Sequence, residues 1–76
     1  MTEKKKGAVQ AIAKRIESME MPQKIRQLFS ETLEQLENAN TTYARGLTKT
    51  VADLPQANIE IINIAAEIEK IETLNQ

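Results

Sequence analysis

The side chains best suited to chemistry in this 76-residue sequence are its carboxylates. Glu31, Glu34 and Glu37 recur every three residues, and Glu69 and Glu72 repeat that spacing. Carboxylates on facing helices can hold two metal ions, but such sites also use Glu-x-x-His motifs. Because the chain contains no histidine and no cysteine, we predict no metal site and no cofactor. We interpret these acids as a solvated face.

Catalysis is disfavoured on similar grounds. Without histidine or cysteine, the acid–base groups are Glu, Asp, Lys and Tyr43, and none has an obvious activating partner. Ser18 and Ser30 lack a base at a recognisable spacing, and Gly7 and Gly46 stand alone, so no phosphate-binding loop is present. We therefore predict a protein that is not an enzyme and has no small-molecule substrate.

Positive charge is concentrated in the first third of the chain. Residues 1–26 hold seven basic and three acidic side chains, whereas residues 27–76 hold three basic and eight acidic ones. Such a basic segment can meet phosphate oxygens or an anionic membrane surface. The candidate anion-binding residues are Lys4, Lys5, Lys6, Lys14 and Arg15. A solvated terminus is the simpler interpretation, because no other nucleic-acid-binding signature accompanies these residues.

Composition indicates an all-α protein. Ala, Leu, Glu, Gln and Lys are frequent, whereas two glycines and two prolines are too few for a turn-rich β-structure. No apolar run approaches the roughly 20 residues that span a bilayer, and no apolar signal segment follows the charged start. The lack of cysteine fits a reducing compartment. We expect a soluble, cytoplasmic protein of bacterial or phage type.

Three helices are expected to position these residues. The predicted segments are a flexible charged tail (1–6) and a single helical domain (7–76) with helices at about 8–20, 22–53 and 55–74. Pro22 suits the start of the second helix. Asp53 and Gln56 have the spacing of a capping box that would start the third.

Two alternatives concern the helix boundaries. Asn38–Thr42 contains poor helix formers, so a break there competes with a continuous second helix. We predict continuity because the apolar phase persists and no proline interrupts it. The segment 58–61 alternates like a short strand, but the apolar stripe that continues to Ile71 favours a helix.

Apolar residues line one face of each predicted helix. In the third helix, four isoleucines follow a 3, 4, 3 spacing, which favours multi-stranded helix packing. We expect a helical hairpin of the two long helices plus a shorter amino-terminal helix, pairing into an oligomeric helical bundle, with a homodimer favoured. The predicted oligomer or partner interface consists of Leu28, Leu36, Leu47, Ile61, Ile64, Ile68 and Ile71. Tyr43 falls in phase with Leu36 and Leu47, which predicts a half-buried ring.

The predicted function is that of a small, self-associating protein–protein interaction module. It would act on a protein partner as a regulator, an inhibitor or an assembly factor. The alternative is a nucleic-acid or anionic-membrane binder that works through the basic arm and the first helix.

Overall fold

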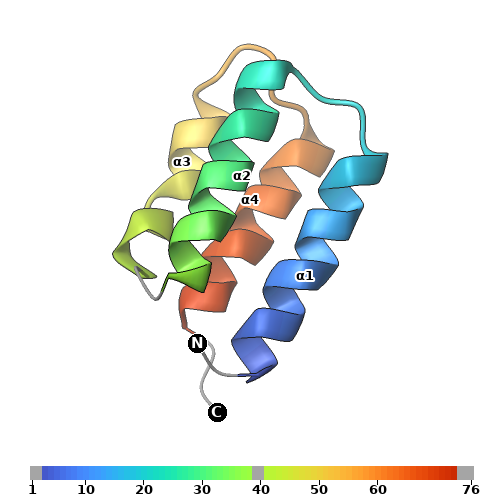
Figure 1. Ribbon diagram of the computed structural model, residues 1–76. Helices are drawn as coiled ribbons and strands as arrows, with labels where there is room; N and C mark the ends of the chain where they lie inside the picture. The colour runs from blue at the N-terminus through green and yellow to red at the C-terminus, as the bar shows by residue number, and fades with distance from the viewer. Residues whose placement is uncertain (1–2, 39–40, 74–76) are drawn as a thin grey trace.

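The computed structural model describes residues 3–38 and 41–73, and all regular structure in these residues is helical (Figure 1). The elements are α1 (Glu3–Ser18), α2 (Gln23–Glu37), the short 3-10 helix η1 (Thr41–Ala44), α3 (Leu47–Ala52) and α4 (Ile59–Glu72). The prediction of an all-α protein is therefore confirmed.

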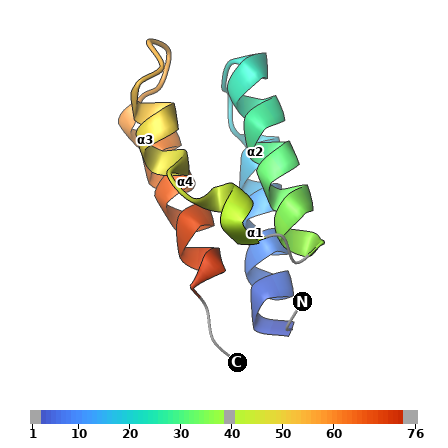
Figure 2. The same ribbon diagram turned by 90° about the vertical axis from the view of Figure 1, so that its left-hand side faces the viewer.

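The helices run alternately up and down in two layers. One layer holds α1 and α2, and the other holds α3 and α4 (Figure 2). The helix α4 packs most closely against α3 and also against α1, while η1 bridges α2 and α4 at one end. The Cα radius of gyration is 11.5 Å, close to the value of about 11 Å expected for a compact chain of this length. The predicted hairpin of two long helices is thus replaced by two helical pairs.

All four α-helices contribute to one apolar core. Val9, Ile12 and Ile16 of α1 are buried, as their 3, 4 spacing predicts. Phe29 of α2 is fully buried and belongs to the same continuous cluster as these residues and the buried isoleucines of α4. The core is therefore completed within a single chain.

The first helix begins earlier than expected. Residues 3–6 form the first turn of α1, so the prediction of a flexible tail is wrong for them, and residues 1–2 lie outside the described residues. Lysine is a good helix former, and Glu3 is favourably placed beside the positive end of the helix dipole. The apolar pattern could not reveal this turn because the turn contains no apolar residue.

The predicted continuous helix over 22–53 is wrong, and a break near Asn38 occurs instead. The helix α2 ends at Glu37, where the Asn38 N–H donates to the Glu34 carbonyl at 3.1 Å. The chain then forms η1 and reverses at Gly46, whose φ of 76° is left-handed. Glycine adopts this conformation without the steric cost that a Cβ imposes. Residues 39–40 lie outside the described residues.

The start of the last helix also differs from the prediction. The helix α4 begins at Ile59, because the Asn58 side chain caps it by accepting the Ile61 N–H at 2.9 Å. Asp53 instead caps the end of α3, so the predicted capping box does not form. Residues 58–61 are a cap and a helical turn, not a strand, and Leu74 lies outside the described residues.

Three polar contacts tie the helices together. The Arg26 guanidinium of α2 donates to the Ile16 carbonyl at 2.7 Å and so caps the end of α1. Glu69 of α4 accepts the backbone N–H of Thr48 at 2.7 Å and so caps the start of α3. These contacts satisfy backbone groups that a helix end leaves without an intrahelical partner. Across the layers, Arg15 of α1 pairs with Glu67 of α4.

Candidate interaction surface

The residues predicted for the oligomer interface lie mostly in the core of the single chain. Leu36, Leu47 and four of the six isoleucines of α4 (Ile61, Ile64, Ile68 and Ile71) are at most 4% exposed, and in the predicted set only Leu28 is partly accessible. A second folded molecule cannot reach side chains that are covered by the chain's own helices. Self-association therefore remains a prediction, and any interface with a folded partner has to use other residues.

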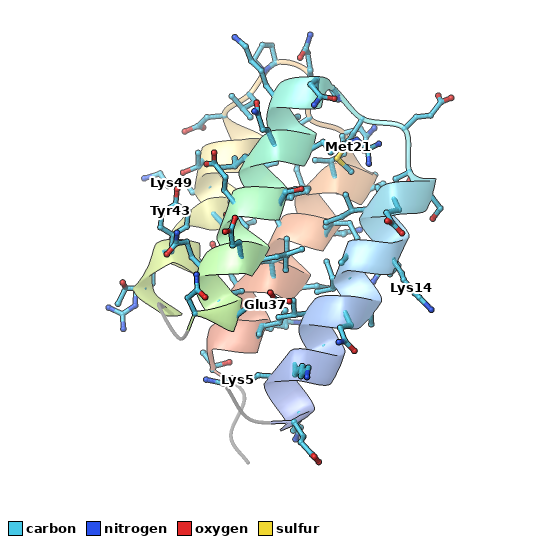
Figure 3. All side chains as sticks on the ribbon, viewed as in Figure 1. Lys5, Lys14, Met21, Glu37, Tyr43 and Lys49 are labelled. Atoms are coloured by element: carbon cyan, nitrogen blue, oxygen red, sulfur yellow. The ribbon has the colours of Figure 1, made fainter. Side chains whose placement is uncertain are left out.

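The five candidate anion-binding residues do not share one face. Lys4 and Lys6 are two positions apart on α1, which separates them by about 200° around the helix. Lys14 points outward from the bundle, whereas Lys5 is half-buried beside the end of α4 (Figure 3). Arg15 donates two hydrogen bonds to Glu67, at 2.6 and 2.7 Å. The structure thus brings no more than part of this set to any one ligand.

The carboxylates of the described residues are not grouped as a metal site either. Glu31, Glu34 and Glu37 are all exposed along α2, and Glu69 is used as the cap of α3. Over residues 3–38 and 41–73, no group of three or more carboxylates could hold a metal ion.

Two open grooves run beside α1. The groove between α1 and α2 has a volume of about 350 Å³, with Ala13, Ile16 and Leu33 on its apolar side and Glu17 and Glu34 among its charged residues. The groove between α1 and α4 has a volume of about 260 Å³ and contains the Arg15–Glu67 ion pair. The first groove also contains Ser30 and Arg26, but the Arg26 guanidinium already donates to the backbone carbonyls of Ile16 and Met19.

Tyr43 was predicted to have a half-buried ring; the residue is 46% exposed and is not part of the core cluster (Figure 3). The break after α2 removes the helical phase that relates Tyr43 to Leu36 and Leu47. In the short helix η1, Ala44 is the residue that enters the core. An exposed tyrosine is a common anchor at protein interfaces, so the structure adds Tyr43 to the candidate contact residues.

The most unusual surface is the outward face of α4. Ile59 is 73% exposed, and Ile62 and Ala66 are partly exposed. The spacing of 3 and 4 residues places these three side chains on one face of the helix, away from the buried isoleucines. We call Ile59, Ile62 and Ala66 the outer strip. A surface helix normally buries one apolar stripe and presents polar residues opposite it, so α4 has more apolar surface than the bundle covers.

The sequence contained a signal for the outer strip. The buried stripe of α4 accounts for Ile61, Ile64, Ile68 and Ile71, and Ile62 is partly buried against the same core, which leaves Ile59 in excess. Only the packing shows which side of α4 the neighbouring helices leave open.

Comparison with known proteins gives no further assignment. No protein family, no curated protein and no solved structure matches this chain. None of the helices in the described part of the chain combines the length and apolar character that a membrane span requires. The functional argument therefore rests on the surface of the molecule itself.

Proposed function

We propose that this protein is a non-catalytic protein–protein interaction module that presents the outer strip of α4 to a protein partner. The single observation that carries the proposal is the 73% exposure of Ile59 at the head of a helix with two further apolar residues on the same face. Contiguous exposed apolar side chains rimmed by polar residues mark interaction sites on folded proteins.

The exposed apolar side chains of α4 are sufficient for the proposed association. The core is complete within one chain, and Ile59 takes no part in it. Large apolar side chains on a surface lose contact with water when a partner covers them, and this burial favours association. A regulator, an inhibitor or an assembly factor would use such a surface without any reacting group.

The alternative of anion binding has less support. It requires Lys4, Lys6, Lys14 and Arg15 to act together, but these residues are distributed around α1 and Arg15 already pairs with Glu67. A phosphate or lipid surface would meet only a subset of these charges. We therefore place the interaction surface on α4.

Site-specific photocrosslinking tests the proposal directly. A benzophenone amino acid would replace Ile59 in the full chain, expressed in the cells from which the sequence comes. The matched control carries the same group at Gln27, an exposed position on α2 in the other layer. We expect protein adducts from position 59 and few from position 27. Equal labelling at both positions, or no protein adduct at position 59, would contradict the proposal.

A further inference from the structure

We propose that the groove between α1 and α2 is a second docking surface, which binds a basic amphipathic helix of a protein partner. The groove has a volume of about 350 Å³ and lies between the two helices at the front of Figure 1. It belongs to the other layer of the bundle from the outer strip. The inference therefore goes beyond the proposed function and does not depend on it.

The charged residues of the groove favour a cationic ligand. Three of them are carboxylates, Glu17 from α1 and Glu34 and Glu37 from α2, and all three are exposed. In the described part of the chain, no ion pair joins any of them to a cation. The one basic residue of the lining, Arg26, donates to two backbone carbonyls beside the end of α1. Three carboxylates against one occupied guanidinium give the groove a net negative charge.

The floor of the groove is apolar. Ile16 of α1 and Leu33 of α2 are 4% and 6% exposed, and Ala13 of α1 is half-buried beside them. A ligand that covers this floor has to bring apolar side chains of its own, which lose contact with water on binding. An amphipathic helix supplies such side chains in one row and places charged residues beside that row.

The positions of the carboxylates match the length of a short helix. Arg26 bonds the carbonyl of Ile16, the residue before Glu17, so Glu17 lies at the Arg26 end of the groove. Glu34 and Glu37 follow Arg26 by eight and eleven residues, which is about 12 and 16 Å along α2. A partner helix of three turns covers that distance. Basic residues two or three turns apart on that helix would reach carboxylates at both ends of the groove.

The cations of α1 nearest in sequence do not line the groove. Lys14 points outward from the bundle (Figure 3), and neither Lys14 nor Lys6 belongs to the lining. A basic partner would therefore meet carboxylates first, and opposite charges across an interface promote its approach. Gln27 also lies outside the lining, so the crosslinking comparison of positions 27 and 59 still addresses the outer strip.

Peptide binding to the full-length protein tests the inference. The probe is a fluorescent designed peptide of about 15 residues, with leucines along one side of its helix and lysines two and three turns apart beside them. A second probe has the same composition in an order that spreads the leucines around the helix. Fluorescence anisotropy at low salt should show binding at least about tenfold tighter for the amphipathic probe. Equal affinities would overturn the inference, because positive charge alone would then explain the binding.

Charge removal inside and outside the groove makes the test specific. Glu34→Gln and Glu37→Gln each remove one carboxylate from the lining and should weaken binding of the amphipathic probe by about three- to fivefold. The matched control Glu31→Gln removes the same charge from an exposed position of α2 outside the lining and should leave the affinity unchanged. Equal losses for positions 31 and 34 would contradict docking in the groove.

A final variant obstructs the groove without changing its charge. Ser30 is exposed and lines the groove from α2, so Ser30→Gln places a larger uncharged side chain where the partner helix would lie. We expect binding to weaken by about tenfold, with helicity by circular dichroism unchanged. An unchanged affinity of Ser30→Gln, or no binding of the amphipathic probe to the unchanged protein, would overturn the inference. Neither result would alter the proposal for the outer strip.

Discussion

The two layers of the bundle present very different outer surfaces. On α1 and α2, no large apolar side chain is exposed, and the outward positions are mostly charged or amide residues. In the other half of the described chain, Ile59 of α4 and Tyr43 of the adjoining η1 are the exposed large apolar side chains. The outer surface of the first layer is therefore polar, whereas the second layer presents the exposed apolar side chains that we propose as an interaction surface.

The layers also differ in how their helices are stabilised. The helices α1 and α2 have 16 and 15 residues, and each has apolar residues in a regular stripe on the core side. The helix α3 has only six residues, too few to be stable alone, and its first turn depends on the Glu69 carboxylate of α4. The helix α3 is thus held in place by tertiary contacts and not by local helix preference.

The largest expected effect comes from a charge placed on the buried side of α4. Ile64 is fully buried, so Ile64→Asp would leave a carboxylate without a partner in the core. We expect a loss of about 4 kcal/mol or more in the free energy of unfolding, which would unfold a domain of this size. Ile68→Asp should behave in the same way.

The matched control for this variant is Ile59→Asp on the exposed side of the same helix. Urea unfolding followed by circular dichroism should show a change of no more than about 0.5 kcal/mol for Ile59→Asp. Equal stability losses for the two substitutions would remove the distinction between the two sides of α4.

A smaller effect is expected at the turn that starts the second layer. Gly46 has a φ of 76°, so Gly46→Ala should cost about 1–2 kcal/mol of stability, although open space surrounds the site. Gly7 lies within α1, also in open space, so Gly7→Ala should stabilise the protein by about 0.5–1 kcal/mol. Thermal unfolding of both variants measures the change in stability that each substitution causes. A stabilising effect of Gly46→Ala would show that the turn does not need a left-handed residue.

The smallest effect is expected for the ion pair that links the layers. The side chains of Arg15 and Glu67 are 51% and 41% exposed, so solvent screens their attraction. Arg15→Gln should therefore lower the free energy of unfolding by no more than about 1 kcal/mol, and less in high salt. Denaturant unfolding at low and high salt is the measurement. A loss that stays large in high salt would show that the contact does more than pair two surface charges.

Much of the helical content followed from local patterns. The stripe of Val9, Ile12 and Ile16 predicted the buried side of α1, and Pro22 marked the start of α2 to within one residue. The predicted continuity through Asn38 was wrong because a helical period can persist across a reversal of the chain. In that segment, the cap at Asn38 and the left-handed Gly46 outweighed the periodic spacing.

The candidate site was not predicted as a site, for a related reason. The isoleucines of α4 pointed to an apolar helix with an interface, and the sequence favoured the regular stripe from Ile61 to Ile71 as the interface. Because the chain's own helices bury that stripe, the exposed isoleucine of the candidate surface is Ile59.

The sequence by itself determined that the chain is helical, which residues repeat with the helical period, and that it lacks histidine and cysteine. Those properties depend on residue type and on near neighbours along the chain. Only the tertiary structure decided where the second predicted helix breaks and which side of α4 remains uncovered. Both outcomes depend on how α3 folds back beside α4, and that contact joins residues far apart in sequence, such as Thr48 and Glu69.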